Sequence, residues 1–215
     1  MTAQEILSHV DHTLLRADAS WTDIRTLCEE ALTYHTASVC IPSAFVRRAH
    51  AAFPTLVICT VVGFPLGHAS LAAKAAETRQ ALDDGASEID MVIPIYALKS
   101  GEPDTAVEEI RTLKRIAGPY ILKVIVETCY LTEEEKITAC RCVTEGGADF
   151  IKTSTGFGPA GAQLADIELF KRHLGPGIQI KAAGGLRTKE AMEAFLQAGC
   201  TRLGASGAVK VLIGQ

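Results

Sequence analysis

The sequence predicts an α/β fold, a single (β/α)8 or TIM barrel formed by residues 1–215 as one domain. Eight short apolar segments have the composition of buried strands, and each is followed by a segment with helical periodicity. Regular alternation of this kind is typical of parallel strands joined by right-handed crossovers. Eight repeats favour closure into a barrel over an open, doubly wound sheet, and no break in composition marks a linker or a second domain.

The first half of the chain supplies four strand and helix units after a short amphipathic start. Continuous apolar runs, such as LVICTVVGFPLG, indicate strands that are buried on both faces. Ser20 can cap the first long helix, with Asp23 placed to reach back to it, and Gly85 can end the third. We expect strands at residues 10–15, 37–41, 56–67 and 87–93, and helices at residues 21–32, 42–50, 70–84 and 103–117.

The second half repeats the same alternation four more times. Thr132 and Glu135 form a capping box, and Gly146 with Gly147 can close the helix that it begins. We expect strands at residues 120–128, 149–153, within IQIKAAGG and at 201–207, and helices at residues 132–145, 163–173, 188–197 and 208–213.

Four charged residues interrupt these apolar strands, where a charge is expensive to bury. Asp90, Lys123, Lys152 and Lys181 fall in the fourth to seventh strands, each flanked by aliphatic or β-branched residues. Neighbouring strands lie about 4.8 Å apart, and the carboxyl ends of barrel strands meet at one mouth. We therefore expect one pocket with three lysines and an acid. The alternative is that all four lie on the surface, as ion pairs or with stems that snorkel outward.

The lysines of the sixth and seventh strands suggest amine chemistry. An ordinary lysine, with a pKa of about 10.4, is almost fully protonated at pH 7 and attacks carbonyls slowly. Burial and a second ammonium nearby both lower such a pKa, so a pair of Lys152 and Lys181 could leave one amine free to form a Schiff base. Spacing alone does not decide which lysine attacks. Asp90 is placed to transfer protons during imine formation.

Glycine-rich turns after the seventh and eighth strands indicate a phosphate site. AGGLR and GASG each precede a helix, so backbone N–H groups can point at an anion, and Arg187 and Ser206 can add donors. Gly156 to Gly158, after the sixth strand, can complete the cradle. The alternative is that these glycines only end the strands.

Composition and charge argue against several other classes of function. The formal charge of -4, the pI near 5.9 and the lack of a basic run argue against nucleic-acid binding. No apolar run is long enough to cross a membrane and no signal peptide is seen, so we expect a cytoplasmic protein. The 7 cysteines lack CxxC spacing and the 6 histidines form no HxxxH pair, so we expect reduced, mostly buried thiols and no metal.

Seven motifs together resemble the deoxyribose-phosphate aldolase family of class I, Schiff-base-forming aldolases: DHTLL, CTVVGFPLG, EIDMVI, KVIVET, FIKTSTGFGP, IKAAGGLR and RLGASG. The resemblance covers nearly the whole chain, and the FIKTSTG and KAAGG pair is specific to it. It implies that Lys152 forms the Schiff base, that the Lys181 charge makes this amine easier to deprotonate, and that Asp90 relays protons. The implied substrate-binding positions are Lys123, Thr153, Gly156, Gly184, Gly185, Arg187, Gly204 and Ser206.

The function implied by this resemblance is reversible cleavage of 2-deoxy-D-ribose 5-phosphate to D-glyceraldehyde 3-phosphate and acetaldehyde, a lyase reaction of deoxyribonucleotide and carbohydrate breakdown. No metal or organic cofactor is expected, because the lysine imine is the electron sink. The expected partners are small phosphosugar and aldehyde substrates and other copies of the chain in a dimer or tetramer, with no nucleic acid or membrane. Two alternatives stay open: another lysine-dependent barrel aldolase with a ketone donor, and a non-catalytic phosphosugar-binding barrel.

Several positions depart from the family pattern. Pro42 and Ser43 stand where many members have asparagine then proline, Pro94 follows the acidic strand where asparagine is frequent, and Gly207 replaces a second serine. The sequence also stops at Gln215, without the longer tail ending in tyrosine that some members use in proton transfer. We expect these differences to affect rate and affinity and not the class of reaction.

Overall fold

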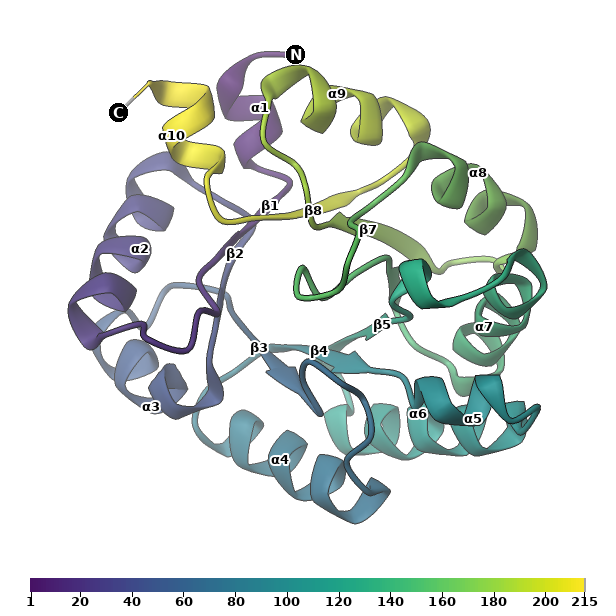
Figure 1. Cartoon of the computed structure of the whole chain (residues 1–215). Helices are drawn as coiled ribbons and strands as arrows, with labels where there is room; N and C mark the ends of the chain where they lie inside the picture. The colour runs from purple at the N-terminus through teal and green to yellow at the C-terminus, as the bar shows by residue number, and fades with distance from the viewer. Residues whose placement is uncertain (215) are drawn as a thin grey trace.

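The barrel predicted from the sequence is present in the computed structural model, which describes residues 1–214. Eight parallel strands close in the order β1 to β8, and β8 pairs with β1. The helices form a ring around the strands, and the two ends of the chain lie on the same side of that ring (Figure 1). The expected difference from the longer family tail that ends in tyrosine falls at Gln215, which lies outside the described residues.

Short strands and longer helices alternate along the chain. The strands are β1 (Val10–Thr13), β2 (Ser38–Ile41), β3 (Ile58–Val62), β4 (Glu88–Val92), β5 (Ile121–Ile125), β6 (Phe150–Lys152), β7 (Gln179–Ala183) and β8 (Arg202–Ala205). The main helices are α2 (Trp21–Tyr34), α3 (Ser43–Ala52), α4 (Leu71–Asp83), α6 (Pro103–Ala117), α7 (Glu133–Gly146), α8 (Leu164–His173), α9 (Lys189–Ala198) and α10 (Ala208–Ile213). Within residues 1–214, no helix has the length and apolar character needed to cross a membrane.

The sequence patterns do not predict three short elements: α1 (Ala3–Leu7), α5 (Ile95–Lys99) and the 3-10 helix η1 (Thr128–Tyr130). Proline has no N–H for a strand ladder, and Pro94 precedes α5, so β4 ends before it. Glu127, with φ of 51°, ends the extended chain after β5, and Gly63, with φ of 63°, does the same after β3. These strands are therefore shorter than their apolar runs, because single backbone conformations override hydrophobicity.

The two faces of each strand have different surroundings. Along β4, Ile89 and Met91 belong to the apolar core between strands and helices, whereas Glu88 and Asp90 alternate with them and face the barrel interior. Barrel interiors are usually filled by branched aliphatic side chains. Here charged side chains occupy much of that interior, and they position the candidate site.

All seven cysteines lie within the described residues and are free thiols, and all but Cys129 are buried, as the sequence predicts. Burial raises the pKa of Cys28, Cys140 and Cys200 to about 12. These three thiols therefore stay protonated and weakly nucleophilic near neutral pH.

A buried lysine away from the predicted site, Lys74 of α4, joins several parts of the barrel wall. Its ammonium pairs with Glu109 of α6 at 2.5 Å and donates to the carbonyl oxygens of Gly67 and Val92 at 2.9 and 2.8 Å. We expect Lys74→Met to lower the free energy of unfolding by about 3–5 kcal/mol, because Glu109 then has a buried charge without its partner.

Urea unfolding at pH 7 measures this loss. Lys189→Met is the matched control, because it removes a lysine on the outer surface of α9 that pairs with Glu193 at 3.8 Å. Its unfolding midpoint should stay close to that of the unchanged protein. Equal midpoints for the two variants would contradict the structural role of Lys74.

Candidate active site

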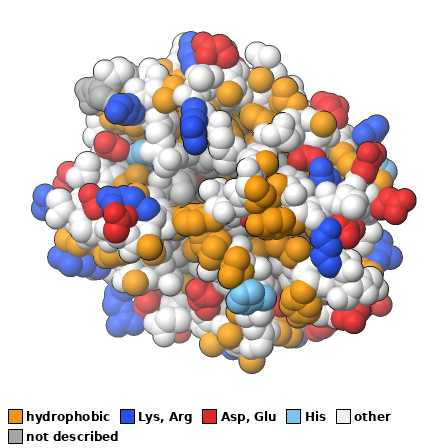
Figure 2. Space-filling model, in the orientation of Figure 1, with side chains coloured by type: hydrophobic (Ala, Val, Ile, Leu, Met, Phe, Trp, Pro, Cys, Tyr) orange, Lys and Arg blue, Asp and Glu red, His pale blue; other side chains and the backbone are white. Residues whose placement is uncertain are grey.

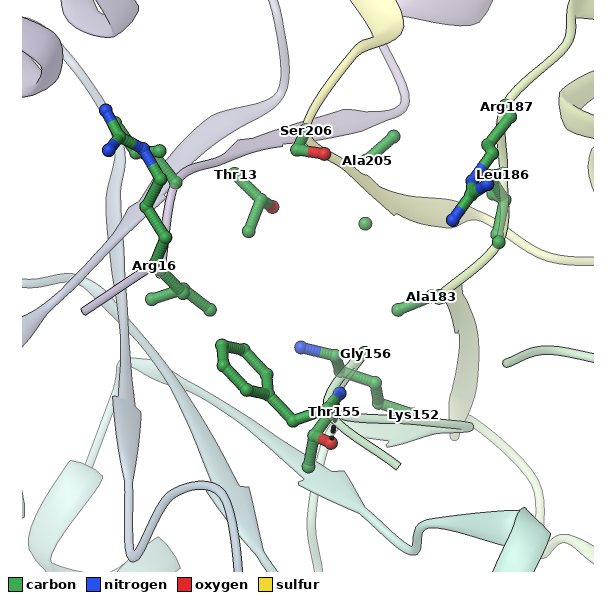
Figure 3. Close-up of a pocket in the computed structure, with 16 residues that line it drawn as sticks. Thr13, Arg16, Lys152, Thr155, Gly156, Ala183, Leu186, Arg187, Ala205 and Ser206 are labelled. Atoms are coloured by element: carbon green, nitrogen blue, oxygen red, sulfur yellow. Dashed lines mark hydrogen bonds between the residues drawn. The ribbon is translucent and has the colours of Figure 1, made fainter. Parts of the chain in front are cut away.

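A cavity of about 340 Å³ opens where the carboxyl ends of the strands meet. The segments that follow β1, β6, β7 and β8 form its wall (Figure 3). Hydrophobic side chains gather across the middle of this face of the molecule (Figure 2). The predicted site residues that line the cavity are Lys152, Gly156, Gly184, Gly185, Arg187, Gly204 and Ser206.

The other four predicted residues are buried and do not line the cavity. Asp90, Lys123 and Lys181 lie in the barrel interior, with no exposed surface. Thr153 is also fully buried; its hydroxyl lies 3.2 Å from the carbonyl oxygen of Ala183 and accepts the N–H of the same residue at 3.1 Å. The structure thus places the Thr153 side chain between β6 and β7.

Lys152 connects the cavity with the barrel interior. It is the last residue of β6, and only 3% of its surface is exposed. Its amine points into the cavity and donates to Oδ2 of Asp90 at 2.8 Å (Figure 3). The register of β6 and β7 places Lys152 directly beside Lys181. The sixth strand therefore presents a nearly dry amine at the edge of the cavity.

Asp90 bonds to all three predicted lysines. Its Oδ2 accepts hydrogen bonds from Lys152 and, at 2.6 Å, from Lys181, and its Oδ1 accepts from Lys123 at 2.9 Å and from the Cys59 thiol at 3.1 Å. Burial would raise the pKa of this carboxyl, but the three ammonium groups hold it well below its usual range. Asp90 is therefore an anion at neutral pH and holds the three lysine side chains together as their shared hydrogen-bond acceptor.

Lys181 and Lys123 are held in their charged forms. Burial alone would lower the pKa of Lys181, but the carboxylates of Asp11 and Asp90 raise it well above its ordinary value. The pKa of Lys123 is raised in the same way, since Asp90 and other anionic neighbours outweigh burial. Lys181 is thus a stable ammonium next to Lys152, with a shared carboxylate between them.

Three charged residues that the sequence patterns do not identify as site residues complete this network. Arg202 donates to Asp11 at 2.5 Å and to Glu88 at 2.9 Å, and Lys181 also donates to Asp11. Burial would raise the pKa of Asp11, but Lys181, Lys123 and Arg202 hold it below its usual range. The signal in the sequence for Asp11 and Glu88 is an acidic residue within a segment that otherwise has the composition of a buried strand. The interior charge cluster comprises Asp11, Glu88, Asp90, Lys123, Lys152, Lys181 and Arg202.

The cavity is also lined by residues that the sequence patterns leave out, among them Thr13, Arg16 and Phe157. Arg16 lies across the cavity from Arg187 (Figure 3), and its guanidinium pairs with Asp18 at 2.8 Å and with an acid of α2 at 2.9 Å. The Arg16 guanidinium is thus already paired with two carboxylates, so Arg187 is the arginine that can offer its charge to an anion in the cavity. Loop residues such as Arg16 and Phe157 have no periodic pattern from which their position could be predicted.

Glycine conformations shape the wall at the ends of β7 and β8. Gly184 and Gly185 have φ of 83° and 82°, which residues with a side chain rarely adopt. A Cβ at Gly184 would also lie 3.0 Å from Cα of Gly161. Ser206 lies between Arg16 and Arg187 at the cavity edge (Figure 3). These turns can approach a ligand closely and offer hydroxyl and guanidinium donors to an anion.

Two groups of side chains in the barrel interior each have three possible metal-ligating atoms within 4.8 Å of one another. The groups are Cys40, Cys59 and Asp90, and Asp11, Cys59 and Glu88. Lys123 donates to Cys59, Glu88 and Asp90. An ammonium therefore already lies among these donors and supplies the positive charge that they need.

Three comparisons relate the chain to known proteins. Residues 6–212 match the family described as DeoC/LacD family aldolase. The chain is 58% identical over 216 residues to a deoxyribose-phosphate aldolase of Clostridium botulinum (strain Eklund 17B / Type B), across 100% of this chain and 98% of the relative. It is 49% identical to a deoxyribose-phosphate aldolase of Streptococcus agalactiae (strain ATCC BAA-611), across 100% and 97%. The tetrameric deoxyribose phosphate aldolase structure from Aeropyrum pernix matches with a TM-score of 0.91 and 28% identity, over 99% of this chain and 92% of that one.

Proposed function

Because this chain belongs to the DeoC/LacD family of aldolases, we propose that it is a class I aldolase for 2-deoxy-D-ribose 5-phosphate that works through an imine on Lys152. The proposed reaction is reversible cleavage of this sugar phosphate to D-glyceraldehyde 3-phosphate and acetaldehyde. Relatives at 58% and 49% identity carry the name of this activity, which supports the choice of substrate.

The observation that carries the proposal is the position of Lys152 in the interior charge cluster. Among the described residues that line the cavity, it is the one lysine. It has one carboxylate partner within 4 Å in the described chain, whereas Lys181 has two and Lys123 has three. Of the three lysines in the cluster, Lys152 therefore combines the fewest carboxylate partners with the access to substrate that imine formation requires.

The steps of the reaction follow from these groups. In the cleavage direction, the free amine of Lys152 adds to the C1 aldehyde of the open-chain sugar, and loss of water gives an imine. Asp90, acting through a water molecule, accepts the proton of the 3-hydroxyl, and the C2–C3 bond breaks. C3 leaves as the aldehyde carbon of D-glyceraldehyde 3-phosphate, and the electron pair of the broken bond moves into the protonated imine to form an enamine. Protonation of C2 and addition of water then release acetaldehyde and restore the amine. Since the protonated imine is the electron sink, these steps require no metal or organic cofactor.

A coupled assay for acetaldehyde tests this function. The chain should release acetaldehyde from 2-deoxyribose 5-phosphate, and in the synthetic direction it should prefer acetaldehyde to dihydroxyacetone as donor. Preference for dihydroxyacetone would favour a ketone-dependent barrel aldolase. Binding of the sugar phosphate without turnover would favour a non-catalytic binding protein.

Arg187, Ser206 and the glycine turns after β7 and β8 support a phosphate site across the cavity from the amine. We expect Arg187→Ala to raise KM for 2-deoxyribose 5-phosphate by about 10-fold or more, because a charge-assisted hydrogen bond to phosphate contributes about 1.5–3 kcal/mol. KM for unphosphorylated 2-deoxyribose should change far less. Arg172→Ala, on the exposed side of α8, is the matched control. An equal rise in KM for both sugars would argue against phosphate contact by Arg187.

We also propose that the enzyme forms a homo-oligomer and acts in the cytoplasm. The tetrameric relative from Aeropyrum pernix supports the first part. Light scattering coupled to size-exclusion chromatography measures the assembly directly, and the mass of a single chain at working concentrations would argue against it.

A further inference from the structure

The loop after β6 forms the side of the cavity next to the proposed nucleophile. Thr155, Gly156 and Phe157 all line the cavity, three to five residues beyond Lys152. Phe157 is 56% exposed and packs edge-on against Phe64, with ring centroids 5.2 Å apart. The path of this loop therefore decides the shape of the cavity beside the amine.

Glu127 holds this loop from the side away from the cavity. Its two carboxylate oxygens accept the N–H of Thr155 at 3.2 and 3.3 Å, and one of them also accepts the Thr155 hydroxyl. The hydroxyl oxygen of Thr155 in turn accepts the N–H of Phe157 at 3.0 Å. Glu127 is only 2% exposed and is not among the residues that line the cavity. One buried carboxylate thus fixes two residues of the cavity wall.

The backbone at Glu127 is bent to make these bonds possible. Its φ of 51° and ψ of 67° are left-handed, a conformation that costs energy for a residue with a Cβ. In the described chain, His35 is the other residue besides glycines with a positive φ. Strained residues of this kind often lie at functional sites. Here the bend ends β5 and directs the carboxylate toward the neighbouring loop.

The same loop packs tightly against the glycine turn after β7. A Cβ at Gly161 would lie 2.2 Å from the carbonyl oxygen of Gly184, and the N–H of Ala162 donates to that oxygen at 3.1 Å. A shift of the loop would therefore displace Gly184 and the proposed phosphate cradle with it.

We propose that Glu127 is a positioning residue for the phosphate-bearing end of the substrate. Acting through Thr155, it holds the wall formed by Gly156 and Phe157, and the Gly184 turn packed against it, in the arrangement that accepts a phosphorylated sugar. This proposal rests on the proposed function, and it assigns part of the preference for phosphate to a residue that does not touch the phosphate.

Glu127→Gln tests the proposal with little change in shape. One oxygen becomes an amide NH2, which cannot accept the N–H of Thr155 and adds a buried donor, and the negative charge that strengthens the bonds to Thr155 is lost. We expect KM for 2-deoxyribose 5-phosphate to rise about 10-fold or more with a smaller change in kcat. KM for unphosphorylated 2-deoxyribose should rise much less. Thr155→Val should reproduce this pattern, and the double variant should be no worse than the more impaired single variant.

The controls separate this proposal from the proposed function. If the unchanged protein does not cleave 2-deoxyribose 5-phosphate, both fail. If it does, two results would overturn the positioning role alone: a KM of Glu127→Gln equal to that of the unchanged protein, or a KM that rises equally for both sugars. Additive increases in KM in the double variant would also overturn it. Should Glu127→Gln fail to fold, Thr155→Val decides through the same comparison of the two sugars.

Discussion

Replacing Lys152 by arginine is expected to lower kcat/KM for 2-deoxyribose 5-phosphate by about 10,000-fold or more. Arginine can still donate a hydrogen bond to Asp90, but a guanidinium stays protonated in proteins and cannot form the imine. The coupled acetaldehyde assay measures the loss, and circular dichroism checks the fold. Lys189→Arg, on the outer helix α9, should keep full activity. Activity of Lys152→Arg within tenfold of the unchanged protein would contradict the nucleophilic role.

Asp90→Asn is expected to separate imine formation from bond cleavage. The amide cannot accept the proton of the 3-hydroxyl, so kcat should fall by about 100-fold to 10,000-fold. Lys152 keeps its amine at the edge of the cavity, so it can still add to an aldehyde. Reductive trapping of acetaldehyde on Lys152 should therefore persist in this variant.

The same change should also lower stability. Asp90 is fully buried and accepts hydrogen bonds from three lysine side chains, so its loss should reduce the free energy of unfolding by about 3–5 kcal/mol. Urea unfolding measures this, with Asp83→Asn on the exposed side of α4 as the control. Unchanged kcat in a folded Asp90→Asn protein would remove Asp90 from the proposed mechanism.

The order of the barrel could be predicted because strands buried on both faces give apolar runs that glycines and helix caps separate. The capping box at Thr132 is present at the start of α7, and the helix predicted at residues 208–213 is found at those residues. The ends of β3 and β5 could not be predicted, since single φ values at Gly63 and Glu127 set them. The helix α5 has five residues, too few for a periodic signal.

The neighbouring positions of Asp90, Lys152 and Lys181 could also be predicted, because charges in buried strands of a barrel converge at one end. The places of the other two carboxylates, Asp11 and Glu88, could not be predicted. Asp11 lies 170 residues from Lys181 and 191 residues from Arg202, and these pairs form only when β8 closes against β1. The sequence therefore suggests two ammonium groups that repel each other directly, whereas the structure has a carboxylate bonded to both.

This difference changes the physical reason for a reactive amine. Lys181 keeps its proton because Asp11 and Asp90 hold it, whereas Lys152 has Asp90 as its one carboxylate partner within 4 Å in the described chain. The reactivity that we propose for Lys152 thus depends on a cluster of seven side chains from six strands. Substitution of Asp11 or Glu88 should therefore change the reactivity of the Lys152 amine, although neither residue lines the cavity.

The proposed mechanism requires Lys152 to be the lysine that forms the imine. Borohydride reduction in the presence of acetaldehyde, followed by peptide mass mapping, identifies that lysine. We expect an ethyl group on Lys152 and none on Lys123 or Lys181. An adduct on Lys181, or no adduct on any lysine, would contradict that mechanism.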